Sequence, residues 1–487
     1  MKPVNTLQNR PATAPAHPRL SPRWALTSLG LSTLLASLGA SVAAVALPTL
    51  AHALGASFQQ VQWVVLAYLL AITTLIVSVG RLGDLMGRRK LLLAGIALFT
   101  LASAVCGLAP SFWLLVAGRA LQGLGAAVMM TLTLALVGET VVQEKTGSTM
   151  GLLATLSAVG TALGPSFGGM LISGFGWPAL FLVNIPLGLL TLGLAWYSLP
   201  VREVPPKPEG AHFDVTGTLL LAMTLAAYAL AMTSGRGSFG GLNIALLLIA
   251  LVGGGLFIRA QSRAASPLMP LTVFRDKSLV SGLATSALVA TVMMATLLVG
   301  PFYLSITLGL PAAFVGLALA AGPSVAALAG VPAGRLTDRF GVQPMRLAGL
   351  ATMVLGCLML SLVPPALGTV GYLTAIVVTT LGYAFFQTAN NTAVMADVAA
   401  QRRGVIAGLL NLSRNLGFFT GASLLGAVFA ATVATNDITR ASPAAVTNGL
   451  HITFAVALAM VTLALLITWK GREPEASPKP QDNPSQA

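Results

Sequence analysis

The chain has 487 residues, of which 56% are hydrophobic and only 8% are charged. Soluble globular proteins carry about 25% charged residues because their surfaces meet water. This composition, with a mean hydropathy of +0.86, therefore excludes a soluble domain and indicates a protein surrounded by lipid. The net charge of +14 would suit a nucleic-acid partner, but the positions of the basic residues, given below, exclude that class of function.

The first 23 residues are rich in proline and arginine, which favours a disordered tail. Apolar runs then follow one another, each long enough to cross a bilayer core of about 30 Å, which needs roughly 20 apolar residues in a helix. The windows are 25–47, 59–80, 91–109, 112–137, 148–172, 178–199, 215–233, 242–260, 279–304, 313–333, 346–363, 370–395, 404–432 and 450–469. The sequence therefore predicts an all-α membrane protein with fourteen helices.

Lysine and arginine set the expected orientation, because cytoplasmic loops of membrane proteins carry an excess of both. With the N-terminus in the cytoplasm, 23 of the 27 basic residues fall in cytoplasmic segments, and only Arg236 and Arg440 fall in outer loops. The other two, Arg119 and Arg414, fall within the membrane. We therefore expect an integral protein of a bacterial inner membrane with both termini in the cytoplasm.

The loop between the second and third predicted helices combines glycines with charges at fixed spacing. The residues are Gly80, Gly83, Asp84, Gly87, Arg88 and Arg89. Glycine permits a tight turn, an acid can face a helix N-terminus, and the basic residues can bind anionic lipid. We interpret the loop as a gating motif, although a basic topology signal around a glycine turn would share several of these features.

In the fourth predicted helix, Arg119, Gln122, Gly123, Ala126 and Met130 share one face by their spacing. An arginine near the middle of a membrane costs about 2.5–3.5 kcal/mol on insertion scales, so it faces the interior of a helix bundle. We expect a functional role for Arg119. The alternative is a structural hydrogen-bonding hub.

The fifth predicted helix carries glycines at four-residue spacing, together with a proline that favours a bend. These residues are Gly160, Gly164, Pro165 and Gly168. Such spacing makes a smooth groove for a neighbouring helix. It is compatible equally with a hinge and with ordinary helix packing.

Polar side chains gather in the twelfth and thirteenth predicted helices: Gln387, Asn390, Asn391, Asn411, Arg414 and Asn415. They form either a substrate-facing wall or a hydrogen-bonded clasp between the two helices. In the second predicted helix, Trp63 and Tyr68 are further candidates for lining a substrate path, with anchoring at the lipid interface as the alternative for Trp63.

The sequence also contains an internal repeat. The segment Gly80–Gly87 returns as Gly334–Gly341 with an offset of 254, and a glycine pattern beginning at Gly151 returns at Gly408 with an offset of 257. The repeat predicts two homologous six-helix bundles with a binding site at their interface and rocking between them. The expected segments are a cytoplasmic tail (1–23), an N-terminal bundle (24–200), a linker with two inserted helices (201–277), a C-terminal bundle (278–470) and a second tail (471–487).

Several function classes find no support. The chain has no P-loop, no H-E-x-x-H and no G-x-S-x-G motif, so no catalytic residue and no ATP-driven transport are expected. Its two cysteines lie in apolar stretches without a metal-binding pattern, so no metal or other cofactor is expected. The expected partners are a small-molecule substrate, protons and membrane lipid, with no nucleic acid. The use of a periplasmic adaptor is left open.

Together these residues resemble the major facilitator superfamily, in its fourteen-helix drug:proton antiporter branch, from about Trp24 to Trp469. The loop at 80–90 is similar to the family's motif A, and residues 119–125 are similar to motif B, whose arginine is implicated in proton coupling in relatives. Residues 160–169 resemble motif C, which is associated with exporters. The resemblance implies the major facilitator fold and multidrug efflux.

The first predicted helix departs from that pattern. The branch usually carries an aspartate where this chain has Gly39, and an asparagine where it has Ala44. No acid lies in the central part of any predicted helix, and Glu139, Asp214 and Asp397 lie near cytoplasmic ends. We expect a proton antiporter that exports hydrophobic, neutral or weakly charged compounds, and little export of dications. An exporter or facilitator of an anionic or neutral metabolite, without tight proton coupling, is the alternative.

A third hypothesis is a membrane sensor or scaffold that transports nothing. The intact gating motif at 80–90 speaks against it.

Overall fold

The computed structural model describes residues 22–140, 146–200, 214–234, 240–264, 275–396, 403–434 and 438–470. Within these ranges all regular structure is helical, and fourteen helical segments are long and apolar enough to cross a membrane. The prediction of an all-α chain with fourteen membrane helices is confirmed. The two predicted tails, apart from residues 22 and 23, and the start of the linker at 201–213 lie outside the described residues, as does Asp397.

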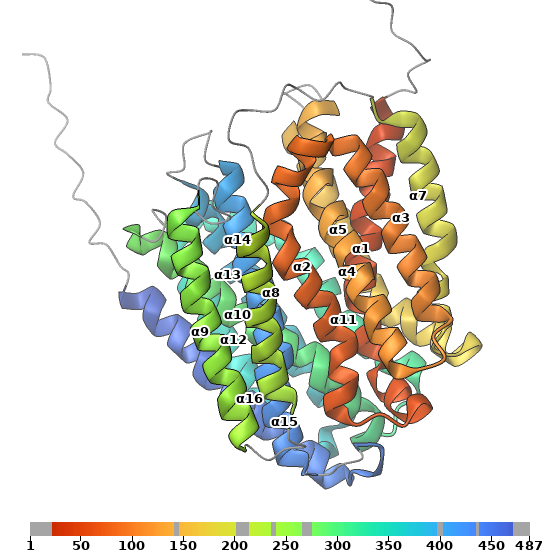
Figure 1. Cartoon of the computed structure of the whole chain (residues 1–487). Coiled ribbons are helices and arrows are strands. Elements are labelled where there is room, and N and C mark those ends of the chain that lie inside the picture. The colour runs from red at the N-terminus through yellow and green to blue at the C-terminus, as the bar shows by residue number, and fades with distance from the viewer. Residues whose placement is uncertain are drawn as a thin grey trace, which may run out of the picture.

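Six membrane spans make up the N-terminal half, drawn from red to yellow in Figure 1. They are α1 (Pro22–Leu54), α2 (Phe58–Met86), α3 (Arg88–Gly107), α4 (Phe112–Thr140), α5 (Thr146–Phe175) and a broken span of α6 (Ala179–Leu182) and α7 (Asn184–Ser198). A capping box starts α2, because the Ser57 side chain accepts from the Gln60 backbone while the Gln60 side chain accepts from the Ser57 backbone.

Two further spans, α8 (Val215–Thr233) and α9 (Gly241–Arg263), stand beside the halves. The C-terminal half contains α10 (Lys277–Phe302), its π-helical extension η3 (Tyr303–Thr307), α11 (Ala312–Phe340), α12 (Val342–Leu362), η4 (Pro365–Leu367), α13 (Gly368–Ala396), α14 (Arg403–Thr420), π-helical η6 (Gly421–Leu425), α15 (Gly426–Val433), η7 (Ile438–Arg440) and α16 (Pro443–Lys470). Asp214 and Asp276 cap the first turns of α8 and α10.

The segment at 80–90 is not the loop that the sequence suggested. Helix α2 continues through Gly80 and Gly83 to Met86, and the chain turns at Gly87 alone, whose φ of 92° favours glycine. A Cβ atom at Gly83 would lie 2.7 Å from Cδ2 of Leu132, so this glycine serves the packing of α2 on α4. The expectation was wrong because hydropathy marks the apolar part of a helix, and the helix itself runs on into polar residues.

The repeat in the sequence is also a repeat in space. Gly160 and Gly164 of α5 pack against α1, where a Cβ atom at Gly160 would lie 2.7 Å from the carbonyl oxygen of Leu34. Their repeat partners Gly417 and Gly421 pack in the same way against the backbone of α10. The chain break at Gly87 is matched by one at Gly341, with a φ of 89°. The fold is therefore two related six-helix bundles plus two inserted helices.

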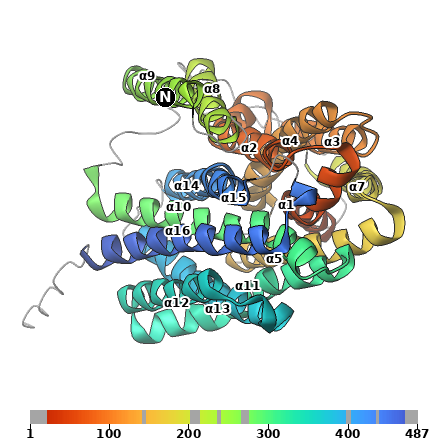
Figure 2. The ribbon, with the colours of Figure 1, turned by 90° about the horizontal axis from the view of Figure 1, so that it is seen from below.

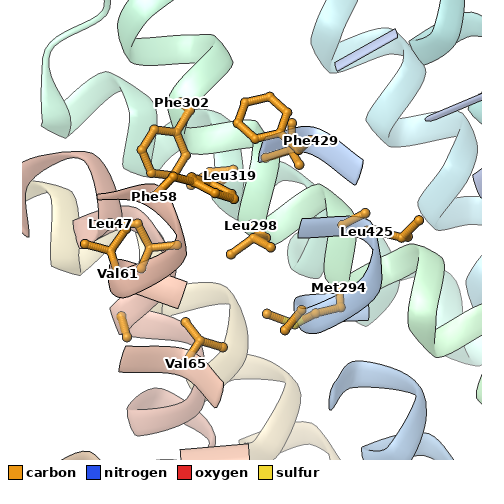
Figure 3. Close-up of a cluster of buried hydrophobic side chains, with 14 of the residues drawn as sticks. Leu47, Phe58, Val61, Val65, Met294, Leu298, Phe302, Leu319, Leu425 and Phe429 are labelled. Atoms are coloured by element: carbon orange, nitrogen blue, oxygen red, sulfur yellow. The ribbon is translucent and has the colours of Figure 1, made fainter. Parts of the chain in front are cut away.

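The two halves meet at one end of the molecule. We call the end where α1 begins and α16 ends the tail face, and the end where α1 finishes and α2 begins the opposite face. At the opposite face, Phe58 of α2 packs on Phe302 and Phe429 of the other half, with ring centroids 5.1 and 5.0 Å apart respectively. Figure 3 shows these rings above a continuous cluster of apolar side chains drawn from both halves.

Toward the tail face less of α11 is covered by other parts of the described chain. Helix α11 is largely buried in the half that lies at the opposite face, whereas much of its surface is exposed in the half that lies at the tail face. Leu328 is 78% exposed and Val331 is 65% exposed there. The structure therefore represents a state in which the halves are closed at the opposite face.

The inserted pair lies along the N-terminal half through α8. Trp63 Nε1 in α2 donates to Thr233 Oγ1 at one end of α8, 3.2 Å away, and the hydroxyls of Ser78 and Thr218 are 3.0 Å apart near the other end. Helix α9 packs on α8 and exposes leucine, isoleucine and valine along most of its length. This exposed apolar surface fits contact with lipid tails.

Candidate functional site

Arg119 is fully buried at the centre of the N-terminal half. Its Nε donates to the carbonyl oxygen of Val64 at 2.8 Å, and its Nη1 donates to the carbonyl oxygen of Gly39 at 3.0 Å and to Oε1 of Gln122. Gln122 passes the network on, since its Nε2 donates to Ser103 Oγ at 2.8 Å. Through these hydrogen bonds Arg119 and Gln122 connect α1, α2, α3 and α4. This arrangement has the form of the hydrogen-bonding hub that was the alternative interpretation of Arg119.

Aromatic rings complete the surroundings of Arg119. The guanidinium carbon lies 4.2 Å from the ring centroid of Tyr68 and 6.0 Å from that of Phe181. The Tyr68 hydroxyl donates to the carbonyl oxygen of Ala36 in α1 at 2.9 Å, which fixes the ring under the charge. A cation over an aromatic face is attracted to the ring quadrupole, and more strongly when water is excluded. Tyr68 is therefore a buried support of Arg119 and lines no open space in this conformation.

The charge of Arg119 has only neutral partners among the described residues. Its Nη2 is buried without a hydrogen bond to any of them. Where the family pattern has a carboxylate, Arg119 instead reaches the backbone carbonyl of Gly39, and a Cβ atom at Gly39 would lie 2.9 Å from Cζ of Phe99. The phenyl ring thus fills the space that a side chain at residue 39 would need. Sequence reasoning found Gly39 but missed Phe99, which lies 60 residues away in another helix.

The residues of the motif at 80–90 lie at the tail face. Arg89 Nη2 donates to the carbonyl oxygen of Trp196 at 2.6 Å, and its guanidinium carbon is 5.5 Å from the Trp196 ring centroid. These contacts attach the start of α3 to the end of α7. Arg88 opens α3, and the side chain of Asp84 lies outside the described residues, as does that of Glu139.

The glycines of α5 divide between two neighbours. Gly160, Gly164 and Gly168 face α1 inside the N-terminal half, and a Cβ atom at Gly168 would lie 2.9 Å from Cγ2 of Val42. Pro165 and Gly169 face α11 of the other half, where their backbone touches that of Ala312 and Gly316. The three glycines that face α1 therefore pack the N-terminal half, whereas Pro165 and Gly169 help to close the opposite face.

A second contact closes that face on the other side of the molecule. Gln62 of α2 is fully buried and its Nε2 donates to the carbonyl oxygen of Ala422 at 3.1 Å, with Gly426 directly beside the amide. Gly426 is the repeat partner of Gly169, with an offset of 257, and Gln62 is the repeat partner of Gly316, with an offset of 254. Sequence reasoning missed Gln62, because its repeat partner Gly316 becomes notable only once the contact between α5 and α11 is known.

One of the two expectations for the polar residues of the C-terminal half was a hydrogen-bonded clasp between α13 and α14. The described hydrogen bonds of these residues do not join α13 directly to α14. Asn390 of α13 donates to the carbonyl oxygen of Gly282 at 3.1 Å, and Ser413 of α14 donates to that of Leu283 at 2.5 Å. Both helices are thus tied to adjacent carbonyls of α10. The described hydrogen bonds of Gln387, Asn391, Asn411, Arg414 and Asn415 stay within their own helices.

Comparison with known sequences places these residues in a family. The model of the Major Facilitator Superfamily matches residues 29–422. Multidrug resistance protein Stp of Mycobacterium tuberculosis is 33% identical over 417 residues, covering 83% of this chain and 75% of Stp. Multidrug efflux pump LfrA of Mycolicibacterium smegmatis is 31% identical over 418 residues, covering 85% and 82% respectively. Riboflavin transporter RibZ of Clostridioides difficile is 26% identical over 449 residues, covering 92% and 97%.

Solved structures of low sequence identity share the fold. A bacterial homologue of the human lysosomal transporter Spinster, in an inward-facing and unoccupied conformation, superimposes with a TM-score of 0.66 at 17% identity, covering 93% of this chain and 99% of that one. The xylose transporter XylE of E. coli gives a TM-score of 0.64 at 14% identity, covering 94% and 99%. The family match, the identities and the paired six-helix bundles agree, and the chain belongs to the major facilitator superfamily of membrane transporters.

Proposed function

We propose that this transporter exports small hydrophobic or drug-like molecules across the bacterial inner membrane by proton antiport and alternating access. In this proposal the tail face is cytoplasmic and both termini lie in the cytoplasm. The observation that carries the substrate class is the 33% and 31% identity, over more than four fifths of the chain, to proteins named for multidrug resistance and efflux.

The geometry supports alternating access. The halves touch at the opposite face through bare backbone at Gly169 and Gly316, and through Gln62 on the other side. Close packing of small residues lets two helices separate and meet again without unpairing many polar groups. A state closed at the opposite face and open at the tail face would admit a compound from the cytoplasm. Rocking of the halves would then release it outside.

Arg119 supports a role in coupling as a fixed positive charge, because an arginine keeps its proton and does not carry one across the membrane itself. The Arg119 guanidinium is buried, is held by carbonyl oxygens and an amide oxygen, and has no carboxylate partner among the described residues. In surroundings of low dielectric constant, a charge that comes near the guanidinium therefore interacts with it strongly. In this proposal Arg119 links α1, α2 and α4 so that a change at one helix reaches the others. The motif at 80–90 gates the tail face.

The proposal is tested in inside-out membrane vesicles with a neutral lipophilic dye. We expect ATP- or lactate-energised vesicles to accumulate the dye and a protonophore to abolish the accumulation. Arg119→Met removes the charge and its donors at similar side-chain length, so transport should fall at least tenfold, whereas Arg119→Lys should keep part of it because the charge remains without the planar fork.

Expression and a single size-exclusion peak are required of each variant, so that loss of folding is not read as loss of transport. Gly174→Ala is the matched control, because a Cβ atom there meets nothing within 4 Å. Dye accumulation that survives the protonophore would contradict proton antiport. Normal transport by a well-folded Arg119→Met variant would remove Arg119 from the coupling mechanism.

A further inference from the structure

A polar cluster that the coupling mechanism does not use lies in the C-terminal half. Arg414 Nη2 donates to Asn411 Oδ1 at 2.7 Å within α14, and Tyr383 of α13 lies within electrostatic reach of Arg414. One and two turns further along α13 lie Gln387 and Asn391, and Gln387 Nε2 donates to Asn391 Oδ1 at 3.2 Å. This last bond leaves the amide hydrogens of Asn391 to donate elsewhere. We call these five side chains the Arg414 cluster.

The cluster faces the interior of the molecule. Ser413 of α14 bonds to a carbonyl of α10, and Ala422 of η6, the π-helical continuation of α14, accepts from a side chain of α2. Residues of an α-helix advance by about 100° each, which places Asn411 and Arg414 on the face between those two contacts. Phe419, whose ring packs on α8, lies on another side. The cluster is therefore turned toward the space between the halves.

The cluster is also reachable, in contrast to the buried hub. All five of its side chains are partly exposed, whereas Arg119 is 0% exposed. Arg414 lies eight residues into its span, which starts at Ile406, or about 12 Å from the end nearest the tail face at a rise of 1.5 Å per residue. A solute that enters from the tail face would meet Arg414 before it reaches the closed end.

The positive charge of Arg414 makes the cluster favour a negatively charged ligand. The described carboxylates, Asp214, Asp276 and Asp338, sit at helix ends near the tail face, and Arg414 forms no ion pair among the described residues. A partly desolvated guanidinium without a counter-charge is stabilised by an anion, and its planar fork matches a carboxylate with two parallel hydrogen bonds. The amides of Gln387 and Asn391 can add neutral donors.

We propose that the Arg414 cluster is a subsite for the carboxylate of amphipathic organic anions, and that such compounds form a substrate class of this exporter. The proposal rests on the proposed export function and specifies what the transport site recognises. Arg414 supplies the charge, and Asn411 orients it. The tie of α13 and α14 to adjacent carbonyls of α10 holds the two sides of the cluster at fixed distance.

The test uses purified protein in liposomes and two fluorescent probes, an aromatic carboxylate and its primary carboxamide. The two probes have nearly the same shape and differ in charge. Flux through empty liposomes is subtracted from each. We expect wild type to transport both probes, and Arg414→Gln to lose at least tenfold in carboxylate flux while carboxamide flux stays within twofold. Arg414→Lys should fall in between for the carboxylate, since a point charge remains without the bidentate fork.

Arg263→Gln is the matched control, because it removes the same charge from an exposed position at the end of α9 and should change neither flux. Equal loss of both fluxes in Arg414→Gln would show a structural role and overturn the subsite. Unchanged carboxylate flux, or wild type that carries only the carboxamide, would overturn it as well. Wild type that carries neither probe, although folded, would contradict the proposed export function itself.

Discussion

At the scale of single residues, Gly39 shows how this chain holds a buried cation without an acid. A carbonyl oxygen has two lone pairs, so the carbonyl of Gly39 can bond within α1 and still accept from Arg119 at 3.0 Å. The missing side chain leaves room that the Phe99 ring occupies, 2.9 Å from where a Cβ atom would stand. Gly39 and Phe99 are therefore complementary in volume, because the ring fills the space that a side chain at residue 39 would occupy. The chain has no carboxylate there to accompany a dication through the membrane.

Introducing an aspartate at residue 39 should give selectivity for cations only if the Phe99 ring is also made smaller. Gly39→Asp alone should lower stability by about 1–3 kcal/mol, because the added atoms overpack against Phe99. Gly39→Asp with Phe99→Leu should recover stability, pair with Arg119 and gain proton-coupled export of dicationic dyes. The measurements are thermal unfolding followed by size exclusion, and dye and proton fluxes in inside-out vesicles. Phe99→Leu alone is the control, and strong dication export by wild type would refute the argument.

At the scale of helices, α5 shows what spacing does and does not predict. Four-residue spacing of Gly160, Gly164 and Gly168 predicts a groove for a neighbouring helix, and the structure places α1 in it. The sequence could not show that Pro165 and Gly169 belong to a different contact, because the partner, α11, lies more than 140 residues away. Periodicity reports which residues share a face, whereas the neighbour of that face depends on long-range packing. The same limit explains why the polar residues of α13 and α14 are tied to α10.

The two contacts of α5 should respond differently to a single added methyl group. Gly169→Ala places the new atom against the backbone of Ala312, so it should disfavour the closed state without loosening either half. Gly160→Ala presses on the backbone of α1 within one half and should lower stability by about 1–3 kcal/mol. The readout is maleimide labelling of Val61→Cys, a fully buried residue of the closed end, in a chain whose two native cysteines are buried.

Labelling should rise severalfold with Gly169→Ala and stay at the level of the parent with Gly160→Ala. Gly174→Ala, on the same helix and with no atom near the added carbon, serves as the control for both. Equal labelling in all three variants would mean that the α5–α11 contact does not hold the opposite face closed.

At the scale of the whole molecule, the internal repeat predicts the architecture but not its asymmetry. Corresponding helices pack alike in the two halves, as the glycines at 160 and 417 show. The two contacts that close the opposite face differ, because Gly316 presents bare backbone where its repeat partner Gln62 presents an amide that donates to Ala422. Figure 2 shows the molecule from this closed end, with the inserted α8 and α9 beside α2. The α5–α11 side of the closure thus meets through bare backbone, whereas the α2 side combines a buried hydrogen bond with the packing of Phe58 on Phe302 and Phe429.

If the halves rock against each other, fixing that polar contact should stop transport, whereas fixing a contact within one half should not. Gln62→Cys with Gly426→Cys brings two thiols together across the halves, because the Gln62 amide already lies against Gly426. Ser37→Cys with Ser157→Cys is the matched control inside the N-terminal half, where the two hydroxyls are 2.8 Å apart. Under oxidation the first pair should lose dye export and regain it on reduction, while the second pair should form its disulfide and keep exporting. Export that continues in the oxidised cross-half pair, with the disulfide verified by mass spectrometry, would rule out separation of the opposite face as a step of transport.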